Sequence, residues 1–146
     1  MTIRPLTIED YADLYQLWLS TPGMGLNDVD DSEAGIAQYL RRNPTTCFAA
    51  IESGKLIGAI LSGHDGRRGY ISHTAVALTC RKQGVGNALV DAALHALQDE
   101  GIHKVALVVF QRNATGNAFW ERLGFHTRDD LIYRNKALSD LKRIDT

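Results

Sequence analysis

The sequence is poor in cysteine and proline, and these shortages exclude whole classes of protein. Only two cysteines occur in 146 residues, Cys47 and Cys80. They form no C-x-x-C pair, and neither lies at metal-ligand spacing from a histidine, so a disulfide framework and a cysteine-based metal centre are excluded. We expect both thiols to be reduced and predict no metal site.

Long apolar runs and an excess of one charge are also missing. No segment approaches the ~20 apolar residues that a membrane helix needs, and the first residues lack the apolar run of a signal peptide. Lys and Arg number 16 against 17 Asp and Glu, a net charge of −1, so no broad basic surface is indicated. We therefore expect a cytoplasmic protein that binds neither nucleic acid nor membrane.

The length suits one domain, which we expect to span residues 1–146 and to bury roughly 68–70% of the unfolded surface. Residues 3–6 contain Pro5 and are typical of an edge strand. Apolar residues at helical spacing then predict a first helix through Trp18, and a second that begins after Asp31 or Ser32.

Three apolar runs follow, joined by turns that contain glycine, and they predict an antiparallel meander: residues 46–51, 56–61 and 70–76. A helix that ends at Gly101 leads to residues 104–110, a nearly unbroken apolar run typical of a strand buried on both faces. Together they predict an α/β fold with a mixed sheet, in which the meander is followed by a parallel, right-handed βαβ unit.

Two more elements complete the expected fold. The pattern predicts a fourth helix over about residues 113–123, ended by Gly124. A last strand is expected around Ile132 and Tyr133, before a charged tail.

The stretch from Val76 to Leu89 is the most informative, because an apolar strand runs through a short basic loop directly into a helix. The first turn of a helix offers unpaired N–H groups beside a partial positive charge, and Gly84 and Gly86 leave those groups accessible. An anion site is one interpretation, and a tight strand-to-helix connection is the other. A dinucleotide fingerprint is excluded because Leu89 stands where the third glycine would be.

Two blocks in this order resemble the GNAT superfamily of acetyl-CoA-dependent N-acetyltransferases. Arg81-x-x-Gly84-x-Gly86 matches the pyrophosphate loop of that family, and residues 113–125, ending in Leu-Gly-Phe, match its asparagine-containing helix. The resemblance implies a GNAT-like fold whose central strands splay apart, and transfer of acetyl from acetyl-CoA to a primary amine of a small molecule or peptide. A second copy of the chain is a further candidate partner.

The resemblance also implies which residues hold coenzyme A. Main-chain groups of the strand end would bind the pantetheine arm, amides of the loop would bind the pyrophosphate with two basic side chains flanking it, and Asn113 would contact the cofactor. Asn113 is equally suited to cap its helix. The predicted cofactor residues are Val76, Ala77, Leu78, Arg81, Lys82, Gln83, Gly84, Val85, Gly86, Asn87, Ala88 and Asn113.

The catalytic residues depart from the family pattern. The glutamate that similar enzymes often carry before the loop is absent, and His73 is the only group on that strand that titrates near neutral pH. His73 is therefore the candidate general base. Two alternatives are that His73 is a hydrogen-bonded core residue, and that a chain of waters acts as the base. Trp120 stands where many relatives have a tyrosine, and indole cannot supply a proton. The acid is therefore Tyr133, water, or not needed.

The acceptor site is expected between the first two helices and the meander. Three acidic residues, Asp28, Asp30 and Asp31, form a cluster that could attract an ammonium group, although a solvated loop with a helix cap explains them as well. Trp18, Met24 and Asn27 are further candidates for this acceptor site, although core packing on the first helix explains Trp18 better. Because Trp120 replaces the tyrosine and the glutamate is missing, a non-catalytic acyl-CoA-binding module is the alternative function.

Overall fold

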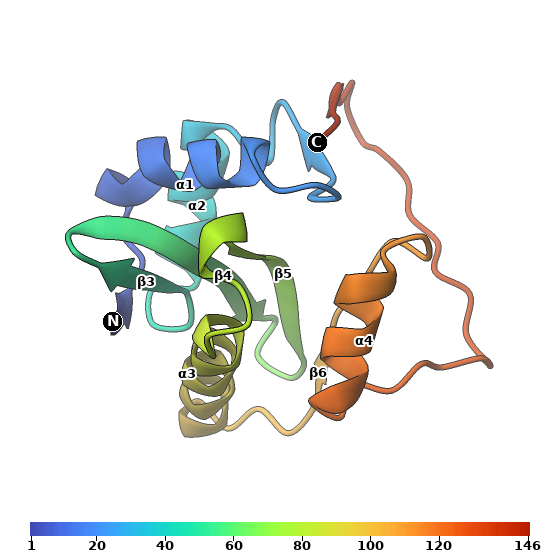
Figure 1. The fold of residues 1–146 in the computed structure, drawn as a ribbon. Helices are drawn as coiled ribbons and strands as arrows, with labels where there is room; N and C mark the ends of the chain where they lie inside the picture. Colours follow the sequence, from blue (N-terminus) through green and yellow to red (C-terminus); the bar gives the residue numbers. More distant parts are fainter.

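A five-stranded mixed sheet forms the centre of the computed structural model, which describes residues 1–146 (Figure 1). Its strand order is β1-β3-β4-β5-β6, and all neighbours are antiparallel except the parallel pair β5 and β6. The strands are β1 Thr2–Pro5, β3 Phe48–Glu52, β4 Lys55–His64, β5 Gly69–Val76 and β6 Val105–Ala106. The predicted edge strand, meander and parallel βαβ unit are thereby confirmed.

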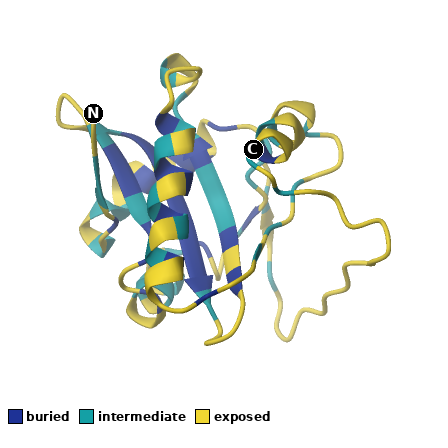
Figure 2. Ribbon diagram, turned by 90° about the horizontal axis from the view of Figure 1, so that it is seen from below, coloured by how far each residue is buried: buried dark blue, intermediate teal, exposed yellow.

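Helices cover both faces of the sheet and build a separate core on each. On one face, α1 and α2 bury Leu14, Trp18 and Ile36 against the strands; on the other, α3 buries Leu89 and Ala93. Figure 2 shows the buried strands behind α3, whose outer side is exposed. The helices are α1 Tyr11–Leu19, α2 Glu33–Arg42, α3 Val85–Asp99 and α4 Ala114–Arg122, with single 3-10 turns η1 Ile8–Asp10 and η2 Leu78–Cys80. None of the helices combines the length and hydropathy needed to cross a bilayer.

The strand predicted over residues 104–110 is wrong in its length and burial. Only Val105 and Ala106 pair with β5. Beyond them burial alternates, with Leu107 and Val109 half-buried and Val108 and Phe110 exposed. The reason is that Leu107 and Val109 pack against the core on the α3 side, whereas no core covers the face that carries Val108 and Phe110, so this segment has one covered face rather than two.

The predicted last strand at Ile132 and Tyr133 is also wrong. Leu131, Ile132 and Tyr133 are exposed and lie in an irregular segment that passes α4 (Figure 1). The last strand is instead β7, Arg143–Ile144, which pairs with β2, Leu26–Asn27, in a separate two-stranded sheet. Three apolar residues in a row lack the length and alternation that specify a strand partner.

Asp10 joins β1 to the first helix through a network of hydrogen bonds. The Arg4 guanidinium donates to both Asp10 carboxylate oxygens at 2.8 Å, and the Thr7 amide donates to Oδ2 at 2.9 Å. These bonds, the Arg4 pair foremost, hold the pKa of Asp10 below its ordinary value. The carboxylate form is therefore the one that stabilises the fold.

We expect Asp10→Asn to lower the free energy of unfolding by about 1–2 kcal/mol at pH 7, because a charge-assisted bidentate pair is lost. A lowered folded pKa contributes stability that is present above the unfolded pKa, near ~3.9, and is lost as the pH falls through the folded value. The difference between the two proteins should therefore shrink below about pH 4. Urea unfolding at pH 7 and pH 3 measures it. The exposed pair Arg128–Asp130 provides the control, since Asp130→Asn should leave stability unchanged.

Candidate active site

The two parallel strands separate after a short pairing and leave a cleft between them. Gly69 pairs with Val105 and Tyr70 with Ala106, and no pairing continues beyond these residues. The edge of β5 from Ile71 onward therefore faces residues 107–110 across a cleft of about 1080 Å³. The predicted splay of the central strands is confirmed.

A β-bulge in β5 decides which side chains face this cleft. Ala75 pairs with Ala59 and Ser72 with Leu61, so one residue of β4 opposes two residues of β5, His73 and Thr74. His73 has a φ of 47°, in the left-handed region. The extra residue turns His73 toward α1 and α2, whereas Ile71 packs on the α3 side.

His73 is held by a buried carboxylate. Its Nε2 lies 2.6 Å from Oδ1 of Asp31, and the edge of its ring meets the Trp18 ring, with centroids 4.9 Å apart. The other carboxylate oxygen of Asp31 accepts the amide N–H of Asn27 at 2.8 Å, and Asp31 is only 5% exposed. His73 is therefore hydrogen-bonded within the protein, as the alternative to a catalytic role predicted. It also lines the cleft, and its Nδ1 has no hydrogen-bond partner in the chain.

The acidic cluster divides in the structure. Asp31 binds His73, Asp30 accepts a hydrogen bond from Asn27 Nδ2 at 2.9 Å, and Asp28 accepts from the Lys142 amide at 2.7 Å. Asp30 and Asp31 line the cleft and Asp28 does not. Ser32 caps α2, accepting the Gly35 amide at 3.0 Å. Trp18 is fully buried on α1, so it belongs to the core as predicted.

The glycine loop presents unpaired amides at the start of α3. The N–H groups of residues 83–87 donate to no group of the chain, whereas the Ala88 amide donates to the Gly84 carbonyl at 3.0 Å. Gly84 caps the helix with a φ of +83°, and no heavy atom lies within 4 Å of where its Cβ would be. Arg81 and Lys82 are exposed beside it. This arrangement fits a pyrophosphate bound at a helix N-terminus.

Gly86 is needed for a different reason. A Cβ at this position would lie 3.1 Å from the Phe119 ring of α4, so the glycine allows the loop to approach that helix. Trp120, the next residue of α4, lines the cleft with Asn113. The close approach therefore brings the loop beside the helix that closes one side of the cleft.

The end of β5 offers fewer main-chain groups than the resemblance implies. Ala77 uses both of its own: its amide donates to Ile57 and its carbonyl accepts from Cys80, each at 2.8 Å. The Val76 carbonyl accepts Nε of Arg81 at 3.4 Å. Because strand amides alternate in direction, the Val76 amide points away from β4, toward the open edge. The nearby Thr74 hydroxyl is buried without a partner and lines the cleft, so it is a further polar group for a ligand.

The remaining predicted residues meet in the same cleft. Asn113 caps α4, since its Oδ1 accepts the Gly116 amide at 2.9 Å, and it lines the cleft as well. Trp120 is nearly buried, edge-on to Phe125. Tyr133 lines the cleft from the irregular segment after α4, so both predicted catalytic residues, His73 and Tyr133, face one space.

Comparison with known proteins identifies the family. A profile of the "Acetyltransferase (GNAT) family" matches residues 11–125. The chain belongs to the GNAT family of acetyltransferases. Similar proteins include an acetyltransferase of Sodalis glossinidius, 28% identical over 138 residues, which cover 94% of this chain and 96% of that one. Another, from Yersinia enterocolitica, is 26% identical over 96% of this chain and 98% of its own.

Solved structures share the fold. Ard1 from Thermoplasma volcanium has a TM-score of 0.75 and 24% identity, with 84% of this chain and 80% of that chain covered. A predicted acetyltransferase with acetyl-CoA from Clostridium acetobutylicum has a TM-score of 0.70 and 20% identity over 92% of this chain and 95% of its own. Membership of the family makes this acetyltransferase an enzyme that uses acetyl-CoA, as the two motif blocks predicted.

In this acetyltransferase, one face of α2 forms the wall of the cleft opposite the splayed strands. Residues at helical spacing line it: Gly35, Gln38, Tyr39 and Arg42. Burial raises the pKa of the Tyr39 phenol, and a hydrogen bond with Ser72 opposes that rise.

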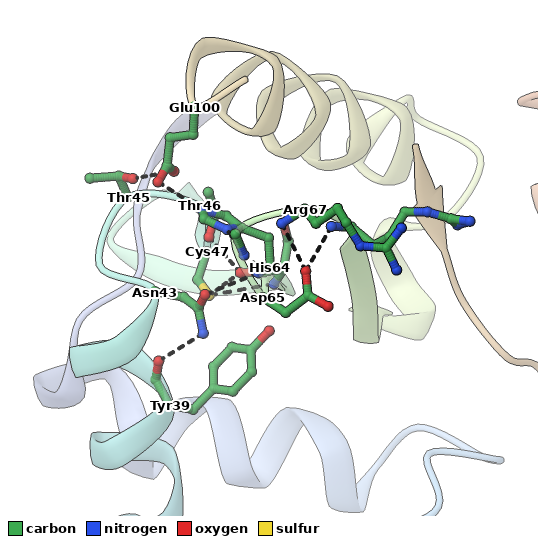
Figure 3. A network of polar contacts seen from close by, with 12 residues as sticks. Tyr39, Asn43, Thr45, Thr46, Cys47, His64, Asp65, Arg67 and Glu100 are labelled. Carbon is green, nitrogen blue, oxygen red and sulfur yellow. Dashed lines mark hydrogen bonds and ion pairs between the residues drawn. The ribbon is translucent and has the colours of Figure 1, made fainter. Parts of the chain in front are cut away.

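A polar network fixes the end of α2 against β4 (Figure 3). Asn43 Nδ2 donates to the Tyr39 carbonyl at 3.3 Å, and its Oδ1 accepts the His64 amide at 3.1 Å. His64 in turn lies 3.0 Å from Glu100 at the end of α3. Cys47 lies beneath, and burial raises the pKa of its thiol to about 11. The wall of the cleft is thereby held in a fixed position.

The contact between His73 and Asp31 and the wall on α2 are the features that sequence reasoning did not bring together. Asp31 lies 42 residues before His73, and no spacing rule links two such positions. The helical spacing of the residues from Gly35 to Arg42 is visible in the sequence. The sequence leads us to expect an acceptor site between the first two helices and the meander, but no local pattern shows which face of α2 would line it.

Proposed function

We propose that this acetyltransferase transfers acetyl from acetyl-CoA to a primary amine of a small molecule or peptide, with His73 as the general base. The observation that carries the proposal is the pair of His73 and Asp31, 2.6 Å apart and facing the cleft. Asp31 engages Nε2, so Nδ1 is the atom that takes the proton. A buried carboxylate on the far nitrogen orients the ring and stabilises the imidazolium.

The residues of the loop would hold the donor. The amides of residues 83–87 and the N-terminus of α3 fit the pyrophosphate, flanked by Arg81 and Lys82. The Val76 amide and the main chain of Leu78 would bind the pantetheine arm, with Asn113 beside it, whereas the main chain of Ala77 is engaged within the protein. Bound acetyl-CoA supplies a thioester whose acyl carbon the amine attacks and whose sulfur leaves.

Proton transfer is the work of the chain's own residues. An alkyl amine has a pKa near ~10.4 and is protonated at neutral pH, so it must lose one proton before its lone pair can attack; His73 Nδ1 would take this proton and pass it to solvent. As the C–N bond forms and the C–S bond breaks, the nitrogen loses a second proton, which balances the proton that the departing sulfur gains. Tyr133 faces the same cleft and would return a proton to the departing sulfur. Trp120 can donate only a hydrogen bond there.

Thermal unfolding with acetyl-CoA tests the donor site. Ligand at ~100 times its Kd adds about 2.7 kcal/mol to stability, which raises Tm by about 5–10 °C for a chain of this size. Release of thiol on a panel of amines then tests transfer. No shift at saturating acetyl-CoA would contradict the proposal, and a shift without thiol release on any amine would favour the binding module.

Three further expectations complete the proposal. A single domain over residues 1–146 is supported by two cores packed on one sheet, and a cytoplasmic location by two free thiols. For a homodimer, the exposed apolar residues of the segment after α4 are a candidate surface: Leu131, Ile132, Tyr133 and Leu138.

A further inference from the structure

The wall on α2 carries one charge that nothing in the protein neutralises. Arg42 is the only Lys or Arg that lines the cleft. Its guanidinium takes part in none of the salt bridges or side-chain hydrogen bonds of the chain, whereas Arg4, Arg128 and Arg143 each pair with an aspartate. A guanidinium presents a planar set of donors that fits a carboxylate with two parallel hydrogen bonds.

The acidic groups of the cleft are already engaged. Asp31 binds His73 and Asp30 binds the Asn27 side chain. No acid of the cleft lies in hydrogen-bond contact with Arg42, and its side chain is exposed, so its guanidinium is free to bind an anionic group of the acceptor. A polyamine would bring the same sign of charge to the guanidinium and is disfavoured.

We infer that the acceptor amine carries a carboxylate and that Arg42 binds it; this rests on the proposed function. Asp31, which holds the base, lies just before α2, and Arg42 is the last residue of that helix, so the base and the guanidinium line different parts of one cleft. The acceptor class is therefore a short peptide with a free amine and a free carboxylate.

Matched pairs of peptides test the inference. Dipeptides and tripeptides with a free C-terminal carboxylate are compared with the same peptides ending in a carboxamide, at fixed acetyl-CoA. We expect the wild type to prefer the carboxylates by about tenfold or more in kcat/KM. Arg42→Gln should raise KM for the carboxylates by about 10- to 100-fold with kcat unchanged, and should leave the carboxamides as they were. Arg42→Lys should retain part of the preference, because it keeps the charge without the paired donors.

Arg41→Gln is the matched control. Arg41 precedes Arg42 in the last turn of α2, is exposed and unpaired as well, and does not line the cleft. Arg41→Gln should therefore change neither the KM for the carboxylate peptides nor the KM for the carboxamide peptides. A wild-type preference for carboxamides, or equal losses for both peptide classes in Arg42→Gln, would overturn the inference.

A binding measurement separates this inference from the proposed function. Acetyl-CoA should raise the Tm of Arg42→Gln as it does that of the wild type, because Arg42 lies away from the loop. If neither these peptides nor any amine of the panel is acetylated, the proposed function fails. Calorimetric titration of the same peptides into the protein saturated with coenzyme A then decides the carboxylate preference. Equal binding of both classes, or no binding, would refute it.

Discussion

Replacing His73 with alanine is expected to lower kcat by about 10²–10⁴-fold and to flatten the dependence of kcat on pH. The side chain is the only imidazole that lines the cleft, and its Nδ1 has no partner in the chain. KM for acetyl-CoA should change little, because the loop that holds the donor is untouched. Steady-state kinetics between pH 6 and 9, on an amine identified by the panel, measure all three quantities.

Two companion variants show whether a loss reflects chemistry or folding. Because His73 has a positive φ, His73→Asn is the better tolerated replacement, and it also lacks a base. Asp31→Asn keeps the shape of the partner but removes its charge, so it should lower kcat less than His73→Ala does. His95→Ala is the control, since His95 is exposed on α3 and its one hydrogen bond is to the Asp91 carbonyl. Unchanged kcat in both His73 variants would remove this residue from the mechanism.

Gly84→Ala is expected to raise KM for acetyl-CoA by about tenfold or more, with kcat at saturating donor preserved. Gly84 caps α3 with a φ of +83°, and the direction of the amides after it depends on that conformation. An alanine there is strained by about 1–2 kcal/mol, which either lowers stability or turns the loop. Steady-state kinetics with varied acetyl-CoA, together with urea unfolding, measure both effects.

The turn between β4 and β5 offers a control of the same kind. Gly66 has a φ of +93° and, like Gly84, no heavy atom near the position of its Cβ, but it does not border the cleft. Gly66→Ala should therefore cost a similar amount of stability and leave KM for acetyl-CoA unchanged. If the two variants raise KM equally, the loop after β5 is not the donor site.

The features that could be predicted from the sequence are the ones encoded locally. The loop from Arg81 to Gly86 is a contiguous motif, and the meander is marked by glycine turns between apolar runs. The N-cap of α4 at Asn113 also depends on neighbours three residues away. Such local patterns can be recognised in the sequence without knowledge of the rest of the fold.

What could not be predicted depends on contacts between distant segments. The apolar run at 104–110 resembles a strand buried on both faces, but only Val105 and Ala106 pair with β5, at the edge of the sheet, and Val108 and Phe110 stay exposed. The partnership of His73 with Asp31 requires both the bulge in β5 and the position of α2. The periodicity of apolar residues describes one segment at a time, so it predicts neither the pairing of residues 104–110 nor the contact of His73 with Asp31.

The bulge in β5 has a consequence for how this strand can change. A strand repeats every two residues, so without the extra residue Ile71 and His73 would share a face. Ile71 belongs to the core under α3, and His73 belongs to the cleft. Deleting Thr74 would make the strand regular and force either Ile71 or His73 onto the wrong side. A deletion here therefore displaces either His73 from the cleft or Ile71 from the core, whereas a substitution at one of these positions leaves the other side chain in place.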